Sequence, residues 1–242
     1  TLALLGRPRA PLVVSRRVAF PVGRGWFSRW KYAHAAHYLA VSRYVARQLR
    51  SAGVPEERIS VVYDGARLPD LTRAAEERAA FRRRLNLPPD AFVAGALASA
   101  REKPLLPLLE AAERRPGLHL LIASAQAGTQ AHPQVANVRF LPLPDDITAF
   151  FFALDAFVHL SESEGLGSAA LLAMAHRVPV VASEVGGLPE IVRDGETGLL
   201  VRNVAEEVGT ALERLFGDRG LAAALAAAGR RFVEANATDD IM

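Results

Sequence analysis

A glycine-rich stretch after an apolar run carries the strongest chemical signal in this 242-residue chain. Residues 155–160 have the pattern of a buried strand, and Glu164, Gly165, Gly167 and Ser168 follow it at the start of an apolar helical stretch. A glycine-rich turn that opens a helix points backbone N–H groups and a positive dipole end outward, which suits a phosphate. A carboxylate at a strand's carboxyl end lies where α/β sheets bind ligands. The stretch predicts an anion site with one acid or, more simply, a tight turn with an exposed carboxylate.

The same residues also fit a dinucleotide-binding fingerprint. The run from Gly165 to Ala170 matches G-x-G-x-x-A, and Glu184 follows the next apolar run near the place of a ribose-binding acid. This pattern would predict an NAD site. However, the fingerprint normally opens the first βαβ unit of a domain, whereas four strands are expected before it here. No acid–base arrangement for hydride transfer is visible, so NAD binding stays open as the weaker interpretation.

The segments around this turn alternate between strand and helix patterns from about residue 81 onward. Short β-branched runs take turns with stretches whose apolar residues recur at helical spacing, which is typical of a parallel α/β sheet. The pattern predicts a nearly complete, doubly wound, Rossmann-like domain. Strands are expected at 91–98, 118–124, 137–141, 155–160, 178–183 and 198–201, and helices at 104–115, 146–153, 167–176 and 187–193, followed by two more.

The first part of the chain holds only about half of such a domain. Strands are expected at 11–15, 38–42 and 58–63, with a helix that Ser42 caps and Gly53 closes. So few strands would leave exposed sheet edges that favour self-association. The predicted organisation is a partial N-terminal domain at 1–66, a connector at 67–80 and a C-terminal domain at 81–242.

Composition excludes several classes of protein. The chain is 50% hydrophobic and 23% charged, which indicates a folded core rather than disorder. It has no Cys, so a disulfide framework, a thiolate nucleophile and a Cys-ligated zinc are excluded. The longest apolar stretch, 147–160, falls short of the about 18 residues of a spanning helix. A cytoplasmic location is expected, and basic clusters such as Arg82–Arg84 are either solvated faces or contacts with an anionic ligand or membrane surface.

Longer runs resemble the signature of the family-4 retaining glycosyltransferases, also described as glycosyl transferases group 1, which have the GT-B fold. The resemblance rests on the runs at 164–175, 178–192 and 194–201, and extends to 139–144, 14–18, 41–42 and 61–65. It implies a C-terminal nucleotide-sugar domain and the last part of an N-terminal acceptor domain. Because the sequence starts at Thr1 within an apolar run, a member truncated at its N-terminus is expected.

The resemblance also implies roles for particular residues. A nucleoside diphosphate that leaves needs positive charge and N–H donors where its own charge develops. In this family Glu164 would contact the donor sugar hydroxyls, and Lys103, unless it is an ordinary surface lysine, would neutralise the diphosphate. The turn formed by Gly165, Leu166, Gly167 and Ser168 would lie beside the sugar and diphosphate, and Phe140 and Leu141 would belong to the base-binding loop, although a core role for Phe140 is equally open.

The implied reaction is transfer of a sugar from a nucleotide-diphosphate sugar to an acceptor with retention of anomeric configuration. In this chemistry the leaving phosphate helps to deprotonate the acceptor, so neither a protein nucleophile nor a metal or other cofactor is expected. The acceptor would be a saccharide, lipid or other small molecule. Nucleic acid is not expected as a partner, because the aromatic run 150–152 has the pattern of core residues.

Three positions depart from the family pattern. Leu172 stands where a second Glu would bond the ribose hydroxyls, Ala98 where an Arg is usual, and Pro104 where a Gly is usual. Each lost charge-assisted bond would cost about 1.5 to 3 kcal/mol of donor binding. The alternative from a different class is therefore a catalytically weak or inactive relative that binds a sugar nucleotide or a protein partner.

Other candidates give weaker signals. His159 lies in an apolar run and is either a core residue or, being near Glu164, part of the donor site. His34 and His37 are three apart on an expected helix and could face one metal, but no third ligand is visible. Ser161 and Ser163 have no recognisable His and Asp partners, so no hydrolase is predicted.

Overall fold

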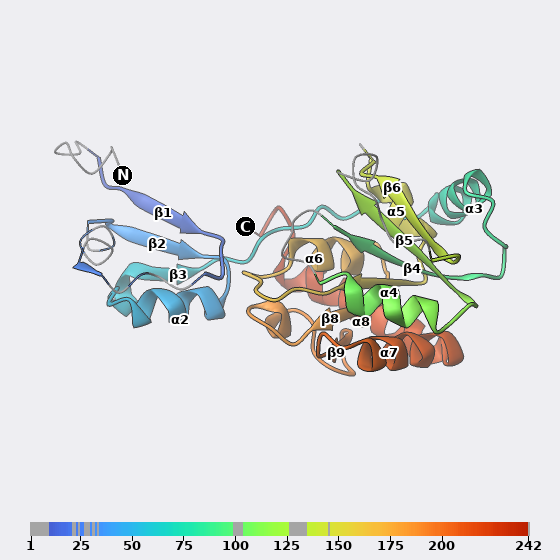
Figure 1. The fold of residues 1–242 in the computed structure, drawn as a ribbon. Coiled ribbons are helices and arrows are strands. Elements are labelled where there is room, and N and C mark those ends of the chain that lie inside the picture. Colours follow the sequence, from blue (N-terminus) through green and yellow to red (C-terminus); the bar gives the residue numbers. More distant parts are fainter. Residues whose placement is uncertain are drawn as a thin grey trace.

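The computed structural model of the chain describes residues 10–20, 23, 25–26, 30, 32, 34–98, 104–125, 135–144 and 146–241. Two parallel sheets, one of three strands and one of six, are joined by the segment that follows β3 (Ile59–Val61). The smaller sheet lies beside the larger domain rather than within it (Figure 1). This arrangement confirms the predicted α/β class. Among the described helices, none has the length and apolar character needed to cross a bilayer.

The smaller sheet has the strand order β1-β2-β3, with β1 at Val13–Arg16 and β2 at His37–Ala40. Helix α2, Arg43–Ser51, follows β2 and packs against β2 and β3. As predicted, Ser42 caps it: the Ser42 side chain accepts from the Val45 N–H. Gly53, at φ 89°, ends the helix in a backbone conformation that Gly adopts readily.

The larger sheet has the strand order β6-β5-β4-β7-β8-β9, and all its neighbouring strands are parallel. This is the doubly wound order 3-2-1-4-5-6. The first three strands are added toward one edge of the sheet and the last three toward the other, so the strand order reverses between β4 and β7. Ligands of such sheets bind outside the carboxyl ends of the strands at that point. The strands are β4 (Phe92–Leu97), β5 (Leu118–Ser124), β6 (Val138–Pro142), β7 (Ala156–His159), β8 (Val180–Ser183) and β9 (Leu199–Val201).

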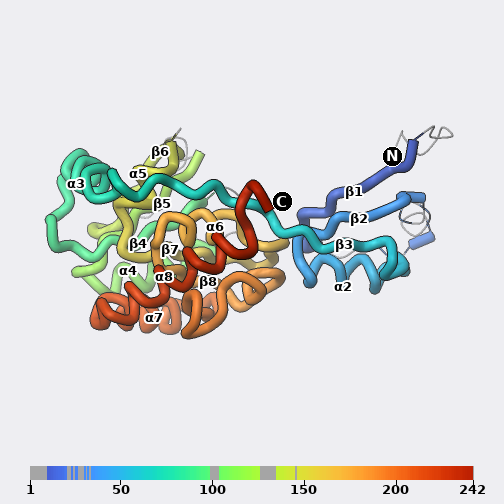
Figure 2. The backbone as a smooth tube through the Cα atoms, turned by 180° about the vertical axis from the view of Figure 1, so that it is seen from behind, coloured from blue at the N-terminus to red at the C-terminus, as the bar shows by residue number. Residues whose placement is uncertain are grey.

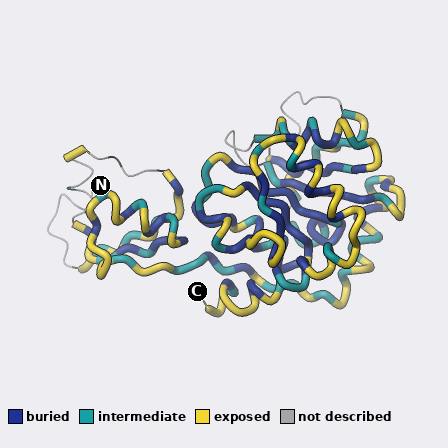
Figure 3. Tube along the Cα trace, turned by 90° about the horizontal axis from the view of Figure 1, so that it is seen from below, coloured by how far each residue is buried: buried dark blue, intermediate teal, exposed yellow. Residues whose placement is uncertain are grey.

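Helices cover both faces of the larger sheet. Alternate strand residues point to opposite faces: Phe92, Ala94 and Ala96 join one apolar cluster and Val93 joins the other. Figure 3 draws the centre of this domain as buried, whereas β6, at the edge of the sheet, has only half-buried and exposed residues. The helices are α3 (Ala74–Arg84), α4 (Leu106–Glu113), α5 (Thr148–Ala153), α6 (Ser168–Ala175), α7 (Ala205–Gly217) and α8 (Arg219–Asn236).

Asp155 ties α3 to the start of β7. Its carboxylate, 8% exposed, lies 2.6 Å from Arg78 and 2.7 Å from Arg82, and it accepts from the Val93 N–H at 2.8 Å. Burial opposes ionisation, but Arg78, the Val93 N–H and Arg82 together outweigh it and hold the pKa of Asp155 below its usual range. Because it satisfies both arginines, the carboxylate fixes the helix that enters the larger domain.

Helix α3 begins inside the stretch predicted to be a connector, 67–80. Its charged side chains had hidden its apolar positions: Phe81 is buried and stacks edge-on with Phe150 of α5. After α8 the chain returns to the connector, where the Ala66 N–H donates to the Ala237 carbonyl at 2.8 Å. Figures 1 and 2 both show the C-terminus beside this segment.

Two local predictions were wrong. The helix expected at 187–193 is a single 3₁₀ turn, Leu188–Glu190. It stops because the Thr197 hydroxyl takes the Ile191 carbonyl and accepts the Arg193 N–H, so the chain turns toward β9. His34 and His37 do not share a helix, because His37 is the first residue of β2.

Candidate functional site

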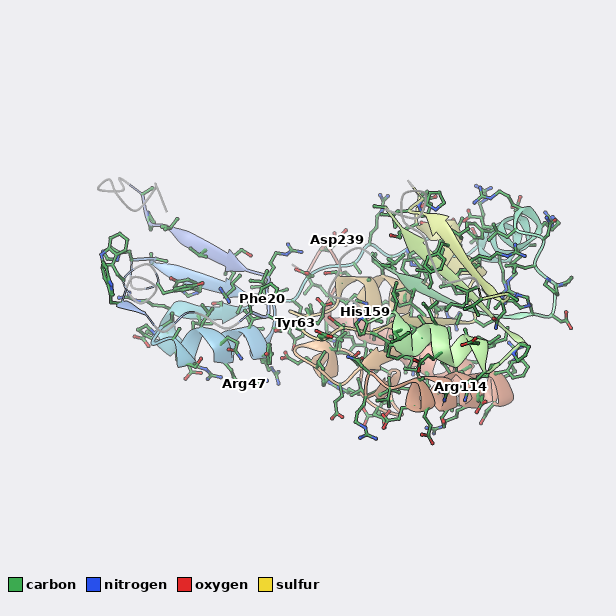
Figure 4. The ribbon with its side chains drawn as sticks, viewed as in Figure 1. Phe20, Arg47, Tyr63, Arg114, His159 and Asp239 are labelled. Carbon is green, nitrogen blue, oxygen red and sulfur yellow. The ribbon has the colours of Figure 1, made fainter. Side chains whose placement is uncertain are left out.

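The predicted turn lies at the carboxyl end of β7, at the point where the strand order reverses. His159 is the last residue of β7, and its Nε2 lies 2.9 Å from Oε2 of Glu164. The His159 side chain is 2% exposed and that of Glu164 is 24% exposed. A buried imidazole thus holds a carboxylate whose remaining surface is open to a ligand. Figure 4 labels His159 on the side of the larger domain that faces the smaller sheet.

Hydrogen bonds from neighbouring loops hold this turn in shape. The Ser161 N–H donates to Ser183 Oγ at 2.9 Å, and Ser161 Oγ donates to the Ser163 carbonyl at 3.0 Å. Asn203 Nδ2 donates to the Ser161 carbonyl at 2.8 Å. Ser161 and Ser163 therefore stabilise the turn.

Glycines allow this turn to pack closely. Gly167 has φ 110°, a conformation that an L side chain rarely adopts. A Cβ on Gly186 would lie 2.0 Å from the Glu164 carbonyl oxygen, and one on Gly187 would lie 2.2 Å from the Gly165 carbonyl oxygen. The Gly187 N–H also donates to the Glu164 carbonyl at 3.0 Å. The loop after β8 thus forms a support directly behind the turn.

The turn opens into helix α6. The N–H groups of Ala170 and Leu171 donate to the Gly167 carbonyl, so the hydrogen-bond ladder of α6 starts there. The preceding N–H groups, of Ser168 and Ala169, have no intrahelical acceptor in such a helix. They lie at the positive end of the helix dipole, an arrangement that favours an anion.

The smaller sheet contacts the same turn. Ser168 Oγ donates to Oδ2 of Asp64 at 2.7 Å, and Oδ1 of Asp64 lies 2.8 Å from Nη2 of Arg17. A Cβ on Gly165 would lie 2.4 Å from the Arg17 carbonyl oxygen and 3.3 Å from Val41. Since these partners follow β1, β2 and β3, the carboxyl edge of the smaller sheet closes against the predicted site.

A second contact between the two parts runs through Glu190. Its carboxylate accepts from the backbone N–H groups of Arg43 and Tyr44 at 2.8 and 2.7 Å, and from the Tyr63 hydroxyl at 3.1 Å. Burial raises the pKa of Tyr63, and the adjacent Glu190 carboxylate raises it further. Figure 4 labels Tyr63 at the end of the smaller domain nearest the larger one.

Leu172 lines a cavity of about 600 Å³ between α6, the start of α5 and the connector. Its wall carries charges of both signs, and His176 lies at its α6 end; the charged residues are Arg67, Arg73, Asp70 and Glu77. Burial lowers the pKa of His176, whose Nδ1 lies 2.7 Å from the Leu172 carbonyl. The position that departs from the family pattern thus borders a cavity large enough for a ligand, but offers it no hydrogen bond.

The other predicted residues are less closely grouped. Phe140 and Leu141 are neighbours on β6 and pack against opposite apolar clusters, so they face opposite sides of the sheet. Ala98 packs against the same cluster as Phe140. Lys103 lies outside the described residues.

His34 and His37, the histidine pair of the first part, bond to two different partners. His34 Nδ1 lies 2.6 Å from the Trp30 carbonyl, and His37 Nε2 lies 2.9 Å from Ser60 Oγ. Over the part of the chain that the structure describes, no three His, Asp or Glu side chains are grouped as metal ligands would be.

The dinucleotide interpretation gains no support from the topology. The turn from Gly165 follows β7, the fourth strand of the sheet in chain order, instead of the first strand, β4. Glu184 is exposed after β8, and its N–H bonds to the Val201 carbonyl of β9.

Sequence reasoning missed the residues that join the two parts: Arg17, Tyr63, Asp64 and Glu190. All four lie within runs that carried the family resemblance, at 14–18, 61–65 and 178–192. That position was the available signal, but no pattern within any of these runs says that a residue more than a hundred positions away is its partner.

Two family models match the sequence. The model described as glycosyl transferases group 1 matches residues 88–218, and the model described as glycosyltransferase family 4 matches residues 1–68. The first covers the larger sheet, including the turn after β7, and the second covers the smaller sheet.

Curated relatives include D-inositol 3-phosphate glycosyltransferases from Mycobacterium tuberculosis and Mycobacterium bovis. Each is 38% identical over 174 residues, a match that covers 64% of this chain. The same match covers 35% of the length of those enzymes, so this chain spans about a third of the relatives it matches.

Solved structures share the fold. Anabaena HepE in complex with UDP and glucose is 20% identical with a TM-score of 0.81, over 98% of this chain and 69% of that chain. Sucrose-phosphate synthase from Thermosynechococcus elongatus is 24% identical with a TM-score of 0.75, over 89% of this chain and 59% of that chain. Their agreement with both sheets confirms the predicted GT-B-like fold.

Proposed function

This chain belongs to the glycosyl transferases group 1 family, and we propose that it binds a nucleotide-diphosphate sugar at the turn 164–168 and transfers the sugar to an acceptor with retention of configuration. The bond between the anomeric carbon and the diphosphate oxygen breaks, and a bond to the acceptor oxygen forms on the same face. The acceptor proton leaves on the diphosphate.

One observation carries the proposal: the partly exposed Glu164 carboxylate is held by buried His159 at the switch point of the larger sheet. A carboxylate fixed in this way accepts hydrogen bonds from sugar hydroxyls without first losing side-chain freedom. We assign Glu164 to the donor sugar and give His159 the task of orienting it.

The diphosphate would lie against the start of α6. The turn of Gly165, Leu166, Gly167 and Ser168 presents the N–H groups there, and the helix dipole stabilises the charge that develops on the leaving group. We assign Lys103 to the same charge, and Phe140 and Leu141, which lie on strand β6 rather than on a loop, to the base. As these two face opposite sides of the sheet, only one of them can contact the base with its side chain.

The two parts would divide the work. We propose that residues 1–66 belong to the acceptor-side domain and residues 81–242 to the nucleotide-sugar domain, with 67–80 between them. Helix α3 packs on α5 of the larger domain. The second half of the connector, where α3 begins, therefore packs as part of that domain.

A calorimetric titration with UDP, GDP, ADP and NAD tests the proposal. UDP is the first probe, because the related HepE structure holds UDP and glucose. Tight binding of one diphosphate supports a donor site, whereas binding of NAD alone, or of none, contradicts it. Glu164→Gln should then lower the affinity for the matching nucleotide sugar by about tenfold more than the affinity for the diphosphate alone, since the substitution removes a charge-assisted acceptor.

A second function, a sugar-nucleotide or partner-binding relative without catalysis, is favoured by Leu172. Its apolar side chain borders the 600 Å³ cavity where the family pattern has a second Glu. In that case the titration would show binding without transfer or donor hydrolysis. Leu172→Glu should raise nucleotide affinity if the cavity adjoins the donor site. An unchanged affinity would show that the cavity and the donor site are separate.

We also propose a cytoplasmic location, with the exposed arginines of the basic clusters, such as Arg83 and Arg84, in peripheral contact with an anionic membrane. Arg82 takes no part in this contact, because it is buried and paired with Asp155. Sedimentation with vesicles that contain anionic lipid, compared with neutral vesicles, tests the membrane contact. Equal binding to both would contradict it.

A further inference from the structure

The Glu190 carboxylate accepts three hydrogen bonds from the smaller domain. Its Oε2 accepts from the Arg43 N–H and the Tyr63 hydroxyl, and its Oε1 accepts from the Tyr44 N–H. The 3₁₀ turn that carries it is held separately, since the Glu190 N–H bonds to the Gly187 carbonyl. The carboxylate is therefore free to serve the contact between domains.

These bonds complete the cap of a helix in the other domain. An α-helix leaves its first four N–H groups without intrahelical acceptors. In α2 the first intrahelical bond runs from the Ala46 N–H to the Ser42 carbonyl, and the Ser42 side chain takes the Val45 N–H. Glu190 takes the N–H groups of Arg43 and Tyr44, the first two residues of the helix. A carboxylate at this end of a helix also interacts favourably with the helix dipole.

The segment that carries Glu190 also supports the turn 164–168. Gly186 and Gly187, four and three residues before Glu190, have no room for a side chain against the carbonyl groups of Glu164 and Gly165. The Gly187 N–H donates to the Glu164 carbonyl at 3.0 Å. A short, tightly packed stretch thus links the turn to the cap of α2.

We propose that Glu190 is a positioning residue: by capping α2 from across the domain boundary, it fixes the edge of the smaller sheet, with Arg17 and Asp64, against the turn 164–168. The inference rests on the proposed function in one respect, that this turn is the donor site. The acceptor side is then held in place before a ligand binds, and loss of Glu190 frees the two domains to separate.

Distances between spin labels on the two domains test this directly. The sequence has no Cys, so Ser51→Cys at the end of α2 and Arg114→Cys at the end of α4 would carry the only two labels. Both positions are exposed. Ser51 is the last residue of α2, at the end opposite to Arg43, and Arg114 lies on the part of the larger domain away from the smaller sheet (Figure 4). Double electron–electron resonance then reports the distribution of the distance between the domains.

The unaltered carboxylate should give one narrow distance distribution. Glu190→Ala removes both carboxylate oxygens, and with them all three hydrogen bonds, and should raise the ratio of separated to closed domains about tenfold or more. Glu190→Gln keeps one acceptor oxygen but points an NH₂ group at the other donors, so an intermediate distribution is expected. Glu196→Ala is the matched control, because Glu196 is an exposed acid in the loop before β9. It should leave the distance distribution unchanged.

Melting curves separate this role from a general loss of structure. The melting temperature of the larger domain should stay the same in Glu190→Ala, because the lost bonds all lead to the other domain. If Glu190→Ala fails to fold, Tyr63→Phe removes a single bond and should broaden the distribution slightly. Equal distributions in the parent protein, Glu190→Ala and Tyr63→Phe would overturn the proposal.

Titration of the same variants with UDP, GDP and ADP distinguishes this inference from the proposed function. If no nucleotide binds the parent protein, the donor site fails and the distance result still decides whether Glu190 joins the domains. If a nucleotide binds and Glu190→Ala leaves the distances unchanged, the donor site stands and the positioning role is wrong.

Discussion

The six-stranded sheet is covered by helices on both faces, whereas the three-stranded sheet leaves apolar side chains in solvent. Val13 of β1 and Val61 of β3 are 52% and 41% exposed, and Phe20, just beyond β1, is 51% exposed. The strands of the larger sheet instead carry fully buried residues such as Leu120, Leu121 and Phe157. Parallel sheets are normally covered on both faces, and among the described residues α2 is the helix that packs against the smaller sheet.

The two regions also use their carboxylates differently. Asp155 is bound by arginines and a backbone N–H of its own domain. Glu190 and Asp64 bind groups across the domain boundary. Removing the Asp155 carboxylate should therefore lower the stability of the larger domain. Removing the carboxylate of Glu190 or Asp64 should instead weaken the contact between the two domains.

The largest expected effect is on the larger domain. Asp155→Asn leaves Arg82, itself buried, without its charged partner and should destabilise that domain by about 3 to 5 kcal/mol. Urea unfolding at pH 7 measures this loss. Glu206→Gln, at an exposed acid, is the control.

The pH dependence of the same variant sharpens the test. Because the folded pKa of Asp155 is lowered, its contribution is present above the unfolded pKa of about 3.9 and disappears as the pH falls through the lower folded value. The stability difference between the parent protein and Asp155→Asn should shrink in acid. A difference that stays constant down to the folded pKa would contradict the role of the charge.

The next effect concerns the boundary between the regions. Gly165→Ala would place a Cβ 2.4 Å from the Arg17 carbonyl oxygen, and overpacking of this size costs about 1 to 3 kcal/mol. The domains should separate, and trypsin should cleave the connector at Arg67 or Arg73 about tenfold faster. Gly117→Ala, where a Cβ meets nothing within 4 Å, should leave the cleavage rate unchanged.

A smaller effect is expected within the smaller domain. Ser42→Ala removes the side-chain cap of α2 and should cost about 1 kcal/mol. Hydrogen exchange should quicken at the α2 amides and stay the same in the larger domain. Ser51→Ala, at the other end of α2, removes only an exposed hydroxyl bond to the Gln48 carbonyl and should not reproduce the effect; equal exchange in both variants would exclude the cap.

The smallest effect is a gain in the larger domain. Arg177 has φ 57° after α6, and an L side chain in this left-handed conformation is strained by about 1 to 2 kcal/mol. Arg177→Gly should raise the free energy of unfolding by about 0.5 to 1 kcal/mol, because the flexibility of Gly offsets part of the gain. Asn86→Gly, at φ 49°, should gain less, since Asn tolerates this conformation. Equal gains would show that strain is not the cause.

Much of the larger domain was predictable because its signals are local. Apolar runs fixed the strands from β4 to β9, and the glycine-rich run after β7 marked the turn that carries Glu164. Helix α3 was missed because its buried face is hidden among charged residues such as Arg78 and Arg82, whose partner Asp155 is more than seventy positions away. The 3₁₀ turn at Leu188–Glu190 was overestimated because its end depends on Thr197.

The sequence by itself therefore determined the parallel α/β architecture, the position of the turn and the family resemblance, since periodicity and turn residues act between near neighbours. Only the tertiary structure decided that His159 bonds Glu164, that Arg17 and Asp64 close on Ser168, and that Glu190 caps α2. These contacts join segments from different strands, loops and domains. Their partners are chosen when the sheets pack against each other, and a linear pattern does not encode the geometry of that packing.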